Sequence, residues 1–228
     1  MGAYAADTGL PAALAGSPVV ADPTWDAPRR MALLAFALLA FGYTVALARR
    51  RRAPALGFGA QAVGVAAEGF AALSWGGGPA GAVLLFVQLL ALSAATGGVA
   101  AAMILAHWYL VTPKLPTGPL ILFARLLLGV LAVQVVLFVL WTGAGLTAPG
   151  ATTGGGPFAA LTGPWAFFAW MRLLVGLVFP LVVSWMAIQT AKSRSMESAT
   201  GLLYINVGTI AAGTILAAGL YFGAGLLV

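Results

Sequence analysis

The chain has 228 residues, of which 62% are hydrophobic and only 7% are charged. An average soluble domain carries about a quarter charged residues, so this composition excludes a soluble fold. The chain has no cysteine and one histidine. It therefore cannot form a disulfide scaffold, hold zinc or an iron–sulfur cluster by cysteine, or bind a haem through two histidines of its own. We expect a polytopic membrane protein.

Runs of about 20 apolar residues predict an all-α fold, a bundle of six transmembrane helices. The predicted spans are residues 31–48, 54–75, 81–112, 118–142, 165–190 and 197–228. Residues 1–30 contain four prolines and no basic start before a hydrophobic run. They predict an extracytoplasmic N-terminal segment rather than a cleaved signal peptide.

The basic residues predict the orientation of the bundle, because short inner loops are enriched in Lys and Arg. With both termini outside, Arg29 and Arg30 are the only basic residues expected on the outer side. The inner loops then hold Arg49, Arg50, Arg51, Arg52, Lys114, Lys192 and Arg194. We therefore predict an N-out, C-out bundle in a bacterial inner membrane, which explains the net charge of +6 without nucleic-acid binding.

Two patterns concern helix packing. Residues 117–129 and 162–176 both begin Thr-Gly-Pro and continue with Phe-Ala and Arg-Leu-Leu, with two extra residues in the second stretch. A true repeat would be inverted, as in many transporters, but chance similarity between apolar helices stays open. Pairs of small residues four apart in residues 81–112 and 197–228 favour close contact between these two spans, or with a partner.

Charged residues inside a membrane usually face the bundle interior and often mark function. Glu68 shares one helix face with Gln61 and Gly64. Arg172 is expected at a similar depth, which predicts a Glu68–Arg172 ion pair. The pair could be purely structural, and an unpaired Glu68 could carry protons, because burial favours the protonated carboxyl.

A second polar group is predicted in the inner leaflet, where the only histidine precedes two aromatic residues. If the third, fourth and sixth spans meet, these side chains line one pocket suited to the carbonyl oxygens of a quinone. The predicted contact residues are His107, Trp108, Tyr109, Arg125, Glu197 and Tyr204. The alternatives are an interfacial histidine bound to a backbone carbonyl and a Glu197 that only caps its helix.

His107 is also a candidate haem ligand, with Met186 or Met196 as the opposite axial ligand. No ligand-spacing motif supports this reading, and no protein metal site is predicted. The chain also lacks a phosphate-binding loop, a nucleophile elbow and a positioned catalytic triad, so catalysis by this chain alone is not expected.

These features predict an integral membrane subunit of a larger respiratory or electron-transfer complex. It would contact a quinone or a cofactor-bearing partner chain through the inner-leaflet pocket. Two alternatives remain. One is a transporter of small solutes, ions or protons built on the inverted repeat, and the other is a non-catalytic membrane scaffold subunit.

Overall fold

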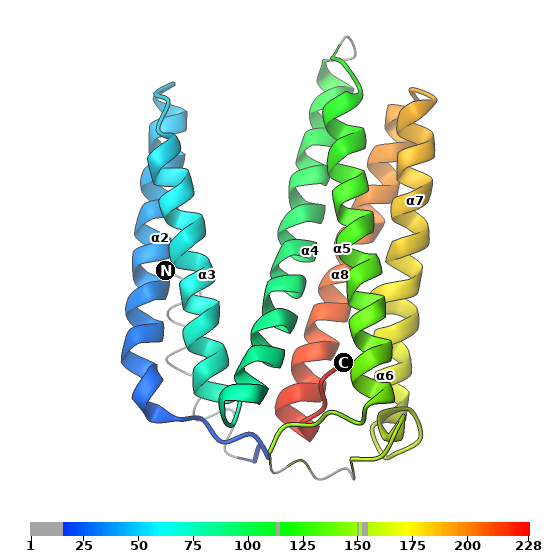
Figure 1. The fold of residues 1–228 in the computed structure, drawn as a ribbon. Helices are drawn as coiled ribbons and strands as arrows, with labels where there is room; N and C mark the ends of the chain where they lie inside the picture. Colours follow the sequence, from blue (N-terminus) through cyan, green and yellow to red (C-terminus); the bar gives the residue numbers. More distant parts are fainter. Residues whose placement is uncertain (1–15, 113–114, 150, 152–154) are drawn as a thin grey trace. The chain divides into compact units, whose positions relative to one another are not determined.

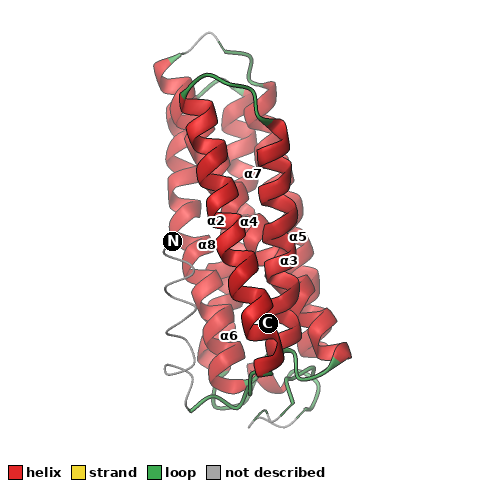
Figure 2. Ribbon diagram, turned by 90° about the vertical axis from the view of Figure 1, so that its left-hand side faces the viewer, coloured by secondary structure: helices red, strands yellow, loops and turns green. Residues whose placement is uncertain are grey.

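The computed structural model describes residues 16–112, 115–149, 151 and 155–228 (Figure 1). In these residues the regular structure is helical, apart from one isolated antiparallel bridge between Thr147 and Leu226 (Figure 2). Six helical segments of the described residues are long and apolar enough to cross a membrane. The predicted all-α, six-span fold is thus confirmed, whereas its N-out, C-out orientation stays a prediction. Lys114 and residues 1–15 lie outside the described residues.

The observed helices follow the predicted spans closely. A short helix η1 (Pro23–Trp25) precedes α2 (Asp26–Ala48), α3 (Pro54–Trp75), α4 (Pro79–Val111) and α5 (Gly118–Gly143). After η2 (Ala159–Leu161), the fifth span consists of α6 (Ala166–Leu173), the π-helical segment η3 (Leu174–Val178) and α7 (Phe179–Lys192). These three run in succession along one rod (Figure 1). The sixth span is α8 (Met196–Ala224).

Helix α2 begins five residues before the predicted start of the first span. The carboxylate of Asp22 accepts a hydrogen bond from Thr24 N (2.9 Å) and caps η1, which leads directly into α2. Asp26 in the first turn of α2 is favoured by the helix dipole, and Pro28 loses no hydrogen bond there. Part of the segment predicted to lie outside the spans is therefore helical.

Helix α8 ends before the predicted end of the last span, although the sequence stays apolar. Gly225 adopts a left-handed conformation (φ 73°) and donates to Tyr221 O at 2.8 Å, while Leu226 N donates to Leu220 O at 3.1 Å. These bonds satisfy the last carbonyls of the helix. The chain then turns back, and Leu226 bridges to Thr147.

The chain divides into two compact units. The first comprises Met1–Leu90 with Ala148–Gly150, and the second comprises Ala91–Thr147 with Ala151–Val228. Within the described residues, the first unit holds α2, α3 and the beginning of α4. The second unit holds the remainder of α4 together with α5, α6, α7 and α8.

In the first unit, a buried arginine ties the start of α2 to the end of α3. Arg29 is only 2% exposed, and its guanidinium lies 4.2 Å from the ring centroid of Trp75. It forms an ion pair with Asp26 (3.0 Å) and donates to Ser74 Oγ (3.2 Å). Ser74 O also accepts a hydrogen bond from Asp22 N (2.7 Å). The segment before α2 is therefore anchored on the end of α3.

In the second unit, α4 and α8 pack side by side, which is the contact that the sequence favours, but a Cβ added at Gly98 would meet α5 and one at Gly213 would meet η3. Thr200 Oγ1 donates to Ala106 O (3.2 Å), and the hydroxyls of Thr96 and Thr214 lie 3.3 Å apart. These two contacts show that the helices run antiparallel. The core around these helices is built mainly of alanine and leucine, and the alanines let the backbones approach closely.

Candidate functional site

A groove lies where α4 ends and α8 begins, within the second unit. Its volume is about 420 Å³, and its lining combines an aromatic ring, opposite charges and apolar side chains. The lining residues are Tyr109, Leu110, Arg194, Ser195, Met196 and Glu197. Volumes of about 300–1,000 Å³ are typical of small-molecule sites.

Local structure explains how the charged residues reach this groove. Arg194 has a left-handed backbone (φ 59°) in the turn between α7 and α8, and its N–H donates to Ala191 O at 3.2 Å. Glu197 follows in the first turn of α8, where a carboxylate is favoured by the helix dipole. Tyr109 is 2% exposed and donates its hydroxyl hydrogen to Pro116 O. The ring is therefore fixed, whereas the two charged side chains are exposed.

The groove brings together Tyr109 and Glu197, two of the six predicted contact residues. The other four, His107, Trp108, Arg125 and Tyr204, are exposed and do not line it. Hydrogen bonds between helices show which residues lie at the same level along the bundle. From these levels, the positions of the four residues follow from the helical rise of about 1.5 Å per residue. His107 adjoins the level of Thr200.

Two of these four lie farther from the groove along the bundle. Tyr204 is four residues beyond Thr200 on α8, which is about 6 Å along the helix. On α5, the bond from Gln134 to Ala91 O places Arg125 about 10 Å short of the level of His107. The polar residues therefore extend along more than two helical turns of the second unit, and only one end of the set forms a groove.

The candidate haem ligands lie on three different helices, α4, α7 and α8. Met196 lines the groove, Met186 is 42% exposed on α7, and His107 is exposed on α4. The described residues contain no group of three or more His, Cys, Asp or Glu that could hold a metal ion. Haem ligation by His107 with either methionine stays a prediction.

A second polar site surrounds Arg172 in α6. Arg172 is 3% exposed, and its Nη2 donates to Gln134 Oε1 of α5 at 2.7 Å. Its Nη1 lies 3.4 Å from Gly176 O. Gln134 in turn donates from Nε2 to Ala91 O of α4 at 2.8 Å. The guanidinium is thus bonded to α5 and to its own span, and Gln134 connects it to α4.

The helix distortion beside Arg172 has a local cause. Pro180 has no N–H, so it cannot bond the carbonyl of Gly176 four residues earlier. The π-helical segment η3 (Leu174–Val178) includes Gly176 and ends two residues before Pro180, and Arg172 donates to the carbonyl of Gly176 instead. One turn farther on, Asn206 of α8 donates to Pro180 O (3.3 Å) and to Ser184 Oγ (2.8 Å). Such π-helical insertions occur frequently at functional sites.

Glu68 and Gln61 lie on α3, in the first unit. Glu68 is partly buried and Gln61 is exposed. The Glu68–Arg172 ion pair stays a prediction, while Gln134 is a partner of Arg172 that sequence reasoning missed. The signal that could have found it is a lone amide in an otherwise apolar stretch of α5; Asn206 stands in α8 in the same way.

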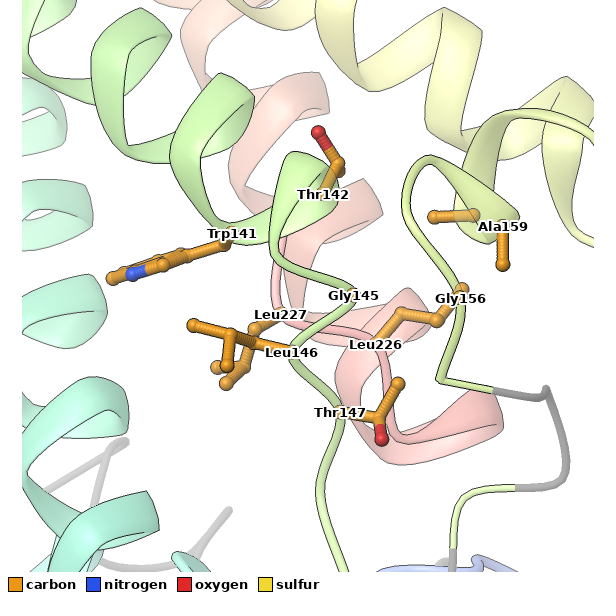
Figure 3. A pocket seen from close by; sticks show the side chains of 10 residues that line it. Trp141, Thr142, Gly145, Leu146, Thr147, Gly156, Ala159, Leu226 and Leu227 are labelled. Carbon is orange, nitrogen blue, oxygen red and sulfur yellow. The ribbon is translucent and has the colours of Figure 1, made fainter.

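The end of the chain closes over a small cavity beside the α5–α6 connection. Side chains of Trp141, Thr142 and Leu226 line it, together with the backbone near Gly145 and Gly156 (Figure 3). Its volume is about 10 Å³, which is about the size needed for one water molecule. This cavity is too small for an organic ligand.

The six apolar helices define a multi-pass membrane protein in a lipid bilayer. No protein family, curated protein or solved structure matches this chain.

Proposed function

We propose that the chain is an integral membrane subunit of a larger respiratory or electron-transfer complex of the bacterial inner membrane. The observation that carries this proposal is the groove of about 420 Å³ between the end of α4 and the start of α8. In the predicted orientation it opens at the inner interface, where a quinone head group or a partner chain would reach it.

The lining of the groove suits a quinone head group. Arg194 carries hydrogen-bond donors for its carbonyl oxygens, and Leu110 and Met196 offer apolar contact to its ring. Glu197 can accept a proton from a reduced quinone. The exposed His107 and Trp108, two residues and one residue before Tyr109, would lie at the contact with a cofactor-bearing partner.

Binding of a short-chain quinone to the purified protein in detergent tests this proposal. We expect Arg194→Gln and Glu197→Gln each to weaken binding about tenfold, equivalent to about 1.4 kcal/mol. Lys192→Gln is the matched control, because Lys192 is an exposed cation two residues from Arg194 that does not line the groove. Equal affinity in all variants, or no binding to the wild-type protein, would contradict the quinone site.

The native assembly provides a separate test of the subunit role. We expect the chain purified from its own membrane to carry redox subunits, identified by mass spectrometry and visible absorption. A stable assembly that contains only this chain would contradict a role in a respiratory complex. A Soret band in the isolated chain would support haem ligation by His107, and its absence would remove that version.

Transport of a small solute or ion is the second candidate, and the interrupted fifth span favours it. Transporters bind substrates where helices are broken near the middle of the membrane. The π-helical segment Leu174–Val178 and Pro180 interrupt this span next to the buried Arg172. Uptake into vesicles containing only this chain would support transport over the subunit role.

A further inference from the structure

The guanidinium of Arg172 is a buried cation held by neutral groups. It lies six residues into the span Ala166–Lys192 and is 3% exposed. Arginine stays charged in proteins, and a charge in this environment is costly unless it is compensated. Within the described residues of the second unit, its partners are the amide oxygen of Gln134 and the carbonyl of Gly176. Neither carries a negative charge.

The hydrogen-bond donors of Arg172 are not all used. Nη2 makes a short bond of 2.7 Å to Gln134, whereas the contact of Nη1 with Gly176 O is long at 3.4 Å. Nε is buried and has no hydrogen-bond partner among the described residues. A buried donor without a partner costs about 1–3 kcal/mol, and more when the group is charged.

The neighbours of Arg172 fix the guanidinium in place. Gln134 is oriented by its bond to Ala91 O, so its oxygen points to Arg172. A Cβ atom at Gly213 or Gly176 would lie 2.9 or 3.2 Å from Nη1, so these glycines close the Nη1 side. The unpartnered donor is therefore on the Nε side of a positioned cation.

We propose that Arg172 binds a small monovalent anion through its Nε edge, as a site within the second unit. The buried positive charge requires a negative partner. The unused Nε donor determines the side of the guanidinium on which this partner would bind. The burial of Nε limits this partner to a few atoms. Chloride and planar oxyanions such as nitrate or formate have this chemistry. The site goes beyond the proposed quinone groove, since none of its residues line that groove.

Thermal unfolding of the purified protein in detergent tests the site. The sodium salts of chloride, nitrate and formate are compared with gluconate, an anion too large for the site, at constant ionic strength. At about five times its Kd, a bound anion should raise the melting temperature of the wild-type protein by about 2–4 °C. Chloride against the oxyanions then distinguishes a halide site from an oxyanion site.

Variants connect the effect to Arg172. Arg172→Gln should abolish the anion-dependent shift, and Arg172→Lys, which keeps the charge but lacks the Nε donor, should reduce it. Arg125→Gln is the matched control, because Arg125 is an exposed arginine of α5, and it should keep the full shift. If Arg172→Gln does not fold, the lysine variant and the wild-type series decide the question.

Two outcomes would overturn the site. One is a wild-type protein whose melting temperature is the same in all four salts, as expected if Glu68 is the counter-ion that the sequence predicts. The other is an equal shift in the wild-type and Arg172 variants, which would be a general salt effect. Neither outcome affects quinone binding at Arg194 and Glu197, so the two proposals fail separately.

Discussion

Arg172 of α6 donates a hydrogen bond of 2.7 Å to the amide oxygen of Gln134 in α5, and the same amide donates to the backbone of α4 at 2.8 Å. One side chain thus connects three helices of the second unit through a buried cation. In a bundle whose core is mostly alanine and leucine, such polar contacts define the register of the helices.

Replacing Gln134 tests the importance of this connection. Gln134→Leu removes the acceptor of a buried charge and the donor to Ala91 O. We expect a loss of about 1–3 kcal/mol in the free energy of unfolding, measured by denaturant titration in detergent micelles. Gln61→Leu, at an exposed glutamine of α3, should change it by less than about 0.5 kcal/mol. Similar losses in both variants would show that the Gln134 contact contributes little.

The glycine contact beside Arg172 gives a second prediction. A Cβ atom at Gly213 of α8 would lie 2.6 Å from Gly176 Cα, a backbone atom that cannot move aside easily. We therefore expect Gly213→Ala to destabilise the protein by about 1–3 kcal/mol, as overpacked cores do.

Gly208 of the same helix is the matched control for Gly213. It is exposed, and an added Cβ would meet nothing within 4 Å. Gly208→Ala should be neutral or stabilising, because alanine favours the helix by about 1 kcal/mol over glycine. Unfolding in the same detergent compares the two variants, and equal stability would contradict the close packing of α8 against η3.

The first unit gives a prediction at Ser74. Its hydroxyl accepts from Arg29 Nη1 (3.2 Å) and donates to Asp22 O (3.3 Å). Ser74→Ala leaves a buried guanidinium short of one partner, so we expect a loss of about 1–3 kcal/mol. We also expect the backbone amides from Asp22 to Arg29 to exchange their hydrogens with solvent faster. Thr44→Ala is the control, since its hydroxyl is exposed and bonds only within its own helix. Unchanged exchange near Asp22 would contradict the anchoring of this segment.

The number and type of helices could be predicted from the sequence because hydropathy runs depend on local composition. The predicted helix ends were less accurate where capping or backbone conformation set a boundary that differs from the end of the apolar run. Helix α2 begins at Asp26, before the apolar run that starts after Arg30. Helix α8 ends just before Gly225, inside an apolar stretch. In both places, capping and backbone conformation decided the boundary.

The partners of the buried polar residues could not be predicted from the sequence. Arg172 was identified because a charge in an apolar span is visible in the sequence, but its partner Gln134 is 38 residues away. Which side chains meet depends on the rotation and register of packed helices, which local periodicity does not determine. Arg29 was assigned to the outer side as an orientation signal. Its burial depends on Trp75 and Ser74, which only the α2–α3 packing brings to it.

Acidification gives the last prediction, at the cap that starts the first span. Hydrogen bonds from the side chain and the backbone of Thr24 lower the pKa of the Asp22 carboxyl below its usual range. A lowered folded-state pKa means that the cap stabilises the fold above the ordinary aspartate pKa of about 3.9. This contribution is lost as the pH falls through the lower pKa of the folded state.

We therefore expect the Thr24 amide to be protected from hydrogen exchange at pH 7 and to lose protection at an acidic pH below the lowered pKa of Asp22, after correction for intrinsic exchange rates. Asp22→Asn keeps an acceptor oxygen without the charge and should show weaker protection with no change between the two pH values. Asp22→Ala should remove the protection at both, because the Oδ1 acceptor of Thr24 N is gone. An acid-induced loss that persists in Asp22→Asn would mean that another group titrates there, with the ion-paired Asp26 as the nearest carboxylate of α2.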